Sequence, residues 1–389
     1  MQGDRRKVAF MLLGFLAESL YWAGVLFILW VAATSNAFGF FKPQPQEAVA
    51  DAVVLITLDG LRPEEVFSGA DQRLIATDNG VKNPEQCREA YWRETREERR
   101  KRLLPFLWQM AEEDGWIAGD VENDSVVEVT NGKYFSYPGY NEILSGQADP
   151  AVDSNDKKHN RNVTVLEWLH RMPKYQGRIE AFGSWDVFPF ILNAPRSGIP
   201  VNAGWQKFEG SVSETQQAIN TVQELLFREW DGVRYDSLTY LAALDSLKRK
   251  QPRVLFVSLG ETDDWAHSGR YDRYLLTATQ NDDMIRRLWQ MTQAIDSYSG
   301  KTLFLVTTDH GRGDGREGWK NHGKTLPGSE RIWIAAFGSG VEQKGIDQGG
   351  RFQQAQVAAT LAKALGEDYQ SSREGIHGPL PIFRSLVRQ

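Results

Sequence analysis

The fold is decided by residues 302–311, which read TLFLVTTDHG. This apolar run is too short for a globular helix, is rich in β-branched and aromatic residues, and ends in polar residues and glycine, so it predicts a buried strand. Three further runs have the same character, at 53–58, 254–259 and 331–337. We expect all four to be parallel strands, because apolar runs without alternation are typical of strands covered on both faces. Weaker strand patterns lie at 125–130 and 178–182.

Helical patterns lie between these strands, among them one long pattern over 84–113. Strands that alternate with helices indicate an α/β fold with a mostly parallel central sheet and helices on both faces. We predict one such domain over 51–389. The stretches of about 68–120 and about 184–250 add little obvious chemistry, so we expect them to be inserted cap segments around the site.

The composition excludes several classes of protein. Hydrophobic residues make up 41% and charged residues 25% of the 389 residues, which excludes a disordered chain and a polytopic membrane protein. The net charge of −6 argues against binding a nucleic-acid polymer, which needs dense positive charge. A single cysteine excludes an internal disulfide and a cysteine-rich zinc site. Any metal ligands must therefore come from Asp, Glu and the six histidines.

The N-terminus carries the pattern of a targeting segment. A basic cluster at 4–7 precedes an apolar stretch at 8–34, which as a helix would span roughly 40 Å and exceed a bilayer core. Basic residues before such a stretch predict that the chain after it lies outside. We predict a signal anchor or signal peptide at 1–37, with a possible cleavage site at 35–37, and a linker at 38–50. The protein is expected to be membrane-anchored and to face the periplasm or the extracellular side, or to be secreted if it is cleaved.

Acidic and histidine side chains follow three of the predicted strands. They are Asp59 after 53–58, then Asp263, Asp264 and His267 after 254–259, then Asp309 and His310 after 302–307, with His322 a little further on. The carboxyl ends of parallel strands meet at one edge of a sheet, where ligands bind in open α/β folds. Carboxylates and imidazoles together suit Zn²⁺ or Mn²⁺. The sequence therefore predicts a metal site at this edge.

A serine precedes a helical pattern in residues 131–144, which read NGKYFSYPGYNEIL. Pro138 can occupy a first helical turn, where its missing N–H costs nothing. This places Ser136 at or just before a helix N-terminus, where free N–H groups and the helix dipole favour an anion. Ser136 could also serve only as a helix cap.

The order of these residues resembles the alkaline phosphatase superfamily, in particular its phosphodiesterase/nucleotide pyrophosphatase branch and its phosphatases. The resemblance covers roughly 53–146 and 254–337. It implies an alkaline phosphatase-like fold and two divalent metal ions, which we expect to be Zn²⁺, with Mn²⁺ as an alternative. One ion would be held by Asp59, Asp309 and His310 beside the Ser136 hydroxyl, and the other by Asp263, His267 and His322. Asp264 is a rival for Asp263.

These residues lead to the hypothesis of a hydrolase of phosphate mono- or diesters. Ser136 would attack phosphorus and form a covalent phosphoserine, because coordination of a hydroxyl to a dication lowers its pKa. Lys133, Asn131, Asn141 and the backbone N–H groups after Ser136 are candidate donors to the substrate oxygens. The expected substrate is a small-molecule or lipid phosphoester, and the membrane is an expected partner through an uncleaved N-terminal helix.

Two alternatives remain open. One is a sulfatase or phosphonate hydrolase of the same superfamily. The sulfatase signature has Arg two residues after the proline, and Tyr140 stands there instead. The other is a membrane-anchored transferase of the phosphoethanolamine type.

Overall fold

Three of the predicted strands form the centre of an eight-stranded sheet. Strand β1 (Ala52–Leu58) lies between β6 (Val254–Leu259) and β7 (Thr302–Thr307). Both neighbours run parallel to β1, with Val53 opposite Val254 on one side and Leu303 on the other. All three strands are fully buried, as their continuous apolar sequences predicted.

Five shorter strands complete this sheet, in the order β10-β2-β9-β7-β1-β6-β4-β5. They are β2 (Gly115–Ala118), β4 (Ile179–Gly183), β5 (Val201–Ala203), β9 (Ile334–Gly338) and β10 (Gly345–Ile346). The weak strand pattern at 178–182 is therefore confirmed as β4. The stretches expected to be cap segments supply β2 and β5 to the two flanks of the sheet.

The prediction of a single parallel strand at 331–337 was wrong. Residues Arg331–Ile332 form β8 and residues Ile334–Gly338 form β9, which runs antiparallel to β7. In the described residues the connection from β7 to β9 contains only one four-residue helix, too short for a parallel crossover, and the chain returns beside β7 in the opposite direction. Strand β8 belongs to a separate three-stranded sheet with β3 (Val126–Glu128) and β11 (Arg351–Gln353), where the weak pattern at 125–130 is also found.

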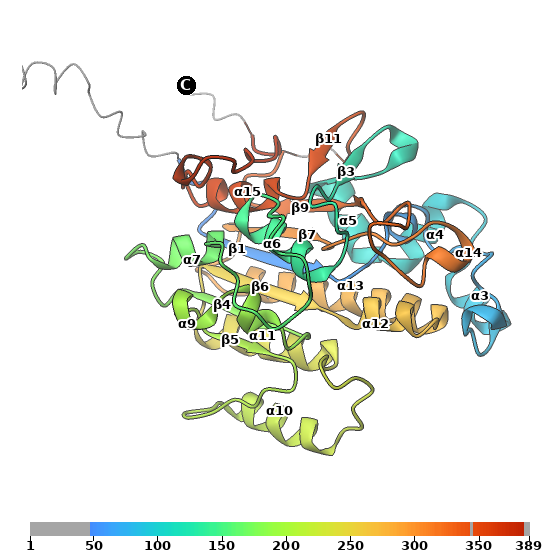
Figure 1. The fold of residues 1–389 in the computed structure, drawn as a ribbon, viewed down its shortest axis with the longest axis horizontal. Coiled ribbons are helices and arrows are strands. Elements are labelled where there is room, and N and C mark those ends of the chain that lie inside the picture. The colour runs from blue at the N-terminus through green and yellow to red at the C-terminus, as the bar shows by residue number, and fades with distance from the viewer. Residues whose placement is uncertain (1–46, 343–344, 385–389) are drawn as a thin grey trace, which may run out of the picture. The chain divides into compact units, whose positions relative to one another are not determined.

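Helices cover both faces of the central sheet, as predicted (Figure 1). Alternate side chains of β1 enter two separate cores, with Val54 and Ile56 in one and Val53 and Leu55 in the other. The first core includes residues of α5 (Pro105–Glu113), α11 (Asp236–Arg249) and α13 (Tyr271–Gln293). The second includes residues of α6 (Ser136–Ser145), α7 (Val165–His170) and α15 (Gln356–Ala364).

The long helical pattern at 84–113 is divided into three helices, contrary to expectation. Helix α3 (Pro84–Tyr91) ends before Thr95, which caps α4 (Arg96–Leu103) through a reciprocal capping box with Glu98. Pro105 then begins α5. The remaining helices are α2 (Pro63–Ser68), α8 (Phe188–Ile191), α9 (Ala194–Ser197), α10 (Glu214–Leu225), α12 (Glu261–His267) and α14 (Gly315–Gly318), with three short 3₁₀ turns at Thr77–Asn79, Val121–Asn123 and Gln370–Ser372.

This computed structural model describes residues 47–342 and 345–384. The predicted signal anchor at 1–37 and most of the linker at 38–50 lie outside the described residues. Within the described ranges, the structure contains no helix that combines the length and the apolar character needed to span a bilayer.

Candidate active site

The predicted ligand residues converge at the carboxyl ends of β1, β6 and β7. Asp59 follows β1 directly, and Asp309 and His310 follow β7 after one threonine. Helix α12 begins two residues after β6 and carries Asp263 and His267, while the loop after α14 carries His322. Two sets of these side chains lie close enough to share an ion: Asp59 with Asp309 and His310, and Asp263 with His310 and His322.

In the first set, three acceptor atoms face one another in the protein interior. His310 Nε2 lies 3.4 Å from Asp59 Oδ1 and 3.4 Å from Asp309 Oδ2. Both carboxylate oxygens are buried and accept no hydrogen bond from any described residue. His310 Nδ1 lies 2.8 Å from the Gly311 carbonyl oxygen, to which it must donate because a carbonyl only accepts. Nε2 is therefore the nitrogen that faces the two carboxylates, and a cation that replaces its proton would be bound by all three groups.

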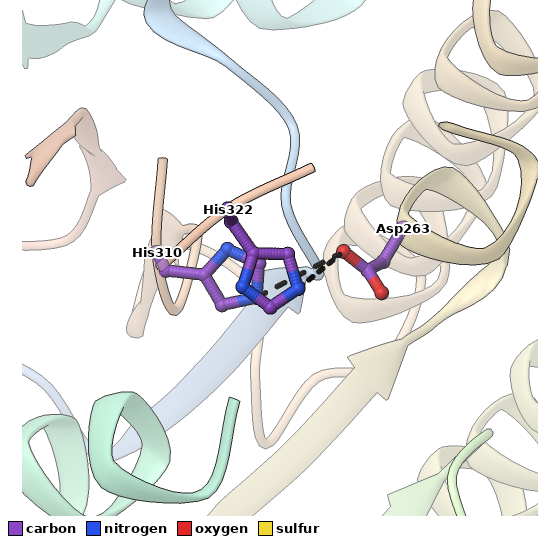
Figure 2. Close-up of side chains that lie close together, drawn as sticks. All are labelled: Asp263, His310 and His322. Atoms are coloured by element: carbon purple, nitrogen blue, oxygen red, sulfur yellow. Dashed lines mark ion pairs between the residues drawn. The ribbon is translucent and has the colours of Figure 1, made fainter. Parts of the chain in front are cut away.

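The second set joins α12 to the loop after α14. Figure 2 shows the imidazoles of His310 and His322 stacked against each other, with their nitrogens directed toward the Asp263 carboxylate. Asp263 Oδ1 lies 3.9 Å from His310 Nε2 and 3.6 Å from His322 Nε2. His322 Nδ1 lies 3.1 Å from the Tyr134 carbonyl oxygen and donates to it. In His322, as in His310, Nε2 is thus the ring nitrogen that faces the cluster.

His267 lies at the exposed side of this set. Its Nε2 is 3.2 Å from Asp263 Oδ2 and 3.0 Å from His322 Nε2. Asp263 therefore contacts both histidines predicted to share its metal ion. Its rival Asp264 has no hydrogen bond or ion pair to a histidine in the described part of the chain, and burial together with the Asp263 carboxylate raises the pKa of Asp264 to about 9.

The electrostatics of the cluster favour a positive charge at its centre. Burial and the Asp59 carboxylate raise the pKa of Asp309 well above its ordinary value, and burial and Asp263 raise the pKa of Asp59. Burial alone would lower the pKa of His310, but the carboxylates of Asp309 and Asp59 outweigh it and raise that pKa to about 9. Burial and the His310 imidazole lower the pKa of His322 well below its ordinary value. Carboxylate oxygens and imidazole nitrogens in this arrangement fit divalent cations such as Zn²⁺.

Arg312 positions Asp263, a role that the sequence did not reveal. Its buried guanidinium pairs with the Asp263 carboxylate and also donates to the carbonyls of Trp319 and Lys320, at 2.7 Å each. Burial would raise the pKa of Asp263, but Arg312 reverses this effect and holds the pKa well below its ordinary value. Because Trp319 and Lys320 precede His322, one side chain fixes both a helix residue and the loop that brings His322 to it.

Ser136 is the first residue of α6, as predicted. Its hydroxyl lies 3.4 Å from His310 Nε2, so the predicted nucleophile reaches the first set of candidate metal ligands. The close approach requires Gly139, because a Cβ there would lie only 2.2 Å from the Asp309 carbonyl oxygen. A glycine one turn into α6 thus allows the start of this helix to pack against the end of β7.

Tyr140 ties the same helix to Asp59, which the sequence analysis also missed. Its hydroxyl donates to Asp59 Oδ2 at 2.9 Å and accepts from Ser258 Oγ at 2.9 Å, and all three residues are buried. Tyr140 follows Ser136 by four residues, so both lie on one face of α6. That spacing is the signal that could have identified Tyr140.

The three side chains predicted to donate to substrate oxygens, Lys133, Asn131 and Asn141, differ in burial and in hydrogen-bond partners. Lys133 is half-buried and forms no ion pair with any described residue. The Asn131 side chain shapes the loop before Ser136, since its Oδ1 accepts from the N–H groups of Lys133 and Tyr134 and its Nδ2 donates to Glu142. The buried Asn141 side chain bonds to residues outside the cluster: Gln147, Asn160 and Asn162.

The backbone N–H groups after Ser136 are not free in this structure, contrary to expectation. The Tyr137 N–H donates to Asn155 Oδ1 at 2.9 Å, and Pro138 has no N–H. The Gly139 N–H donates to the Phe135 carbonyl oxygen at 3.1 Å. The side chain of Asn155, in the loop after α6, thus accepts from the N–H group at the start of α6 that was predicted to be free for a substrate.

Solved structures identify the fold. The wild-type alkaline phosphatase PafA aligns with 85% of this chain and 98% of its own chain, at a TM-score of 0.52 and 11% identity. The chain has the fold of the alkaline phosphatase superfamily. The same fold is found in the lipoteichoic acid synthase LtaP from Listeria monocytogenes (TM-score 0.52, 10% identity, 84% of this chain and 74% of that chain). It is also found in the C-terminal periplasmic domain of EptC from Escherichia coli in complex with Zn (TM-score 0.50, 9% identity, 88% and 90%).

A curated relative is similar over most of this chain. GPI ethanolamine phosphate transferase 1 from Aspergillus oryzae is 22% identical over 385 residues, which cover 90% of this chain and 33% of that protein. The chain therefore spans about a third of this relative's length. No family model matches the sequence. The predicted superfamily resemblance is thus confirmed for the fold, and the relatives connect this fold with phosphoester chemistry.

Proposed function

We propose that this protein is a metal-dependent enzyme that cleaves phosphate esters through nucleophilic attack by Ser136. The observation that carries the proposal is the Ser136 hydroxyl 3.4 Å from His310 Nε2, beside two buried carboxylate oxygens that no described residue satisfies. Asp59, Asp309 and His310 would hold one divalent cation and Asp263, His267 and His322 a second, with Zn²⁺ as the proposed metal and Mn²⁺ as the alternative. When bound, such cations lower the pKa of a nearby hydroxyl and stabilise the charge that develops on a phosphoryl group.

The proposed chemistry exchanges one ester bond for another. Ser136 Oγ forms a bond to phosphorus, the bond from phosphorus to the leaving oxygen breaks, and the serine proton passes to solvent. The leaving oxygen takes a proton from water, and a phosphoserine remains on α6. Tyr140 and Arg312 hold Asp59 and Asp263 in place, while the Lys133 ammonium is the proposed contact for a non-bridging oxygen.

The acceptor in the second half of the reaction decides between two activities. If water attacks the phosphoserine, inorganic or monoesterified phosphate is released and the enzyme is a hydrolase, which is the function we propose. If an alcohol attacks, the enzyme is a transferase. The second candidate is supported by similarity to a GPI ethanolamine phosphate transferase, for which the transferred group would be phosphoethanolamine.

A sulfatase or phosphonate hydrolase receives less support. The position at which a sulfatase has its signature arginine holds Tyr140, whose hydroxyl is bonded to Asp59. We propose an exported location, in keeping with the EptC domain, which is described as periplasmic.

The test is a comparison of Ser136→Ala with the wild-type full-length chain after metal loading. Both are assayed on nitrophenyl phosphate, a phosphodiester, a phosphonate and a sulfate, and acid-quenched samples are searched by mass spectrometry for phosphoserine at position 136. We expect the variant to lose roughly 10³-fold or more of its turnover of phosphate esters and all of the phosphoserine. Ser145→Ala, which alters the other serine of α6, is the matched control and should retain activity. Undiminished turnover of phosphate esters by Ser136→Ala would show that Ser136 is not the nucleophile and would refute the proposal.

The same assay separates the two activities. Phosphatidylethanolamine is supplied as donor, with and without an added alcohol acceptor, and products are identified by mass spectrometry. Release of phosphoethanolamine without acceptor supports hydrolysis. Product formation only when the alcohol is present, with the group attached to it, supports transfer.

A further inference from the structure

Four of the six exposed large hydrophobic side chains of the described residues lie within residues 222–227. Among them are Leu225 at the end of α10, 81% exposed, and Phe227 two residues later, 78% exposed. Val222 and Leu226 belong to the same segment, with exposed fractions of 41% and 39%. We name residues 222–227 the α10 tip. Isolated apolar residues on a surface are ordinary, but a contiguous group of this kind marks an interaction site.

The α10 tip adjoins a hollow. A cavity of about 530 Å³ is lined on one part by Tyr235, Tyr240, Leu241 and Met284. The rest of its lining is polar or charged, and consists of Ser237, Glu261, Thr279, Gln280, Asp283 and Arg287. Tyr235 donates from its hydroxyl to the Phe227 carbonyl oxygen at 2.9 Å, so the rim of the cavity is joined to the tip. The exposed apolar tip therefore adjoins a cavity that is partly aromatic and apolar and partly charged.

Aromatic and cationic side chains adjoin the tip through Tyr235. Trp205 packs edge-on against Tyr235, and the Arg228 guanidinium lies 4.9 Å from the centre of the Trp205 ring. Trp230 contacts Tyr235 and also Trp265, with ring centres 4.8 Å apart in the second pair. Trp265 belongs to α12, the helix that carries Asp263 and His267. An aromatic chain thus connects the tip to the helix of the candidate metal site.

We infer that the α10 tip contacts a lipid bilayer, with Leu225 and Phe227 inserted among the acyl chains. Exposed leucine and phenylalanine, with tryptophan, tyrosine and arginine close by, are the residue types that membrane interfaces favour. A bilayer is the expected occupant because the apolar stretch at 8–34 is a predicted membrane anchor. The linker at 38–50 spans at most about 45 Å, so an uncleaved anchor would keep the domain near the membrane surface. A second copy of the chain is a poorer occupant, since stable protein interfaces use about 20–30 residues on each side.

The inference does not depend on the chemistry of Ser136, so it can fail or succeed separately from the proposed function. If it holds, the candidate site works beside a bilayer surface, where a lipid phosphoester would be presented to it. The tip would then hold α12 close to the lipid headgroups through the Trp230–Trp265 contact.

The test uses the full-length chain in phosphatidylcholine/phosphatidylglycerol nanodiscs, with an environment-sensitive fluorophore on Phe227→Cys. Val121→Cys is the matched control, because Val121 is also an exposed apolar residue, 56% exposed, in a separate 3₁₀ turn. The native Cys87 is buried and is replaced by alanine in both proteins. Leu225→Cys serves as the second tip position if Phe227→Cys fails to fold.

We expect the emission of the tip fluorophore to shift to shorter wavelength and to be quenched at least about twofold by nitroxide-labelled lipids. The fluorophore at position 121 should keep a water-like emission and resist that quenching. Water-like emission at both tip positions would overturn the inference. A shifted emission at the tip without quenching by labelled lipid would also overturn it, because it would indicate burial against protein.

Discussion

Removing a single hydroxyl, in Tyr140→Phe, tests how α6 is coupled to the metal-ligating carboxylates. The variant keeps the ring, which packs edge-on against Phe188 with centres 4.7 Å apart. It loses the 2.9 Å hydrogen bond to Asp59 Oδ2 and the 2.9 Å bond from Ser258 Oγ. The change is therefore confined to the two hydrogen bonds of one buried hydroxyl beside the first candidate ligand set.

The expected magnitude follows from the charge of Asp59. A hydrogen bond to a charged group contributes about 1.5–3 kcal/mol, and the loss of a residue that supports a metal ligand lowers metal affinity by about 10–100-fold. In the metal-free protein, burial raises the pKa of Asp59, so protonation can relieve part of the loss. We expect Tyr140→Phe to reduce the stabilisation by Zn²⁺ by about 1.4–2.7 kcal/mol and to change the metal-free protein less.

Competition titrations against a zinc chelator, with thermal unfolding of the metal-free and loaded proteins, measure both quantities. Tyr137→Phe is the control, because Tyr137 lies in the same helix but donates to the backbone carbonyls of Lys158 and Phe190. Zinc affinity equal to that of the wild type in Tyr140→Phe would refute the coupling. So would an equal loss of affinity in Tyr137→Phe.

Three further outcomes are expected. In Arg312→Lys, the lysine cannot pair with Asp263 and donate to two backbone carbonyls at the same time. Bound zinc, quantified by mass spectrometry, should therefore fall from two ions per chain toward one. Two retained ions would contradict the role of Arg312. Burial raises the pKa of Asp282 to about 7, so the folded metal-free protein retains a proton that the unfolded chain releases near pH 4. As the pH rises from about 4.5 to about 7.5, the free energy of unfolding, measured in urea, should therefore fall in the wild type by up to about 3 kcal/mol more than in Asp282→Asn. Parallel pH profiles of the two proteins would show that Asp282 does not hold this proton. Burial also raises the pKa of Cys87 to about 11, so its alkylation near pH 7.5 should be at least about 100-fold slower in the native protein than in urea; comparable rates would show that the thiol is accessible.

The sequence predicted those parts of the fold that depend on local pattern. The runs at 53–58, 254–259 and 302–307 are continuous and apolar because both faces of β1, β6 and β7 are covered, so their pattern identified the centre of the sheet. The direction of β9 depends on the path of the loop after β7 rather than on its own residues. The pattern at 84–113 concealed the helix boundaries at Thr95 and Pro105, although both carry local signals for a helix start.

In the candidate site, too, some residues could be predicted from local pattern and others depend on tertiary packing. Asp59, Asp309 and His310 could be predicted because each follows a central strand closely, so the topology alone brings them together. Tyr140 and Arg312 could not, since their roles depend on how α6 and the 319–322 loop are placed against distant carboxylates. For the same reason the sequence did not reveal that Asn155 accepts a hydrogen bond from the Tyr137 N–H at the start of α6.

Anomalous diffraction at the zinc edge, from crystals of the zinc-loaded protein, is the most direct measurement of the central claim. We expect one peak within ligand distance, about 2.0–2.2 Å, of Asp59, Asp309 and His310, and a second at the same distance from Asp263 and His322. Both peaks should lie beside the Ser136 hydroxyl. Peaks found only elsewhere, or Asp59 and His322 turned away from any ion, would contradict the account.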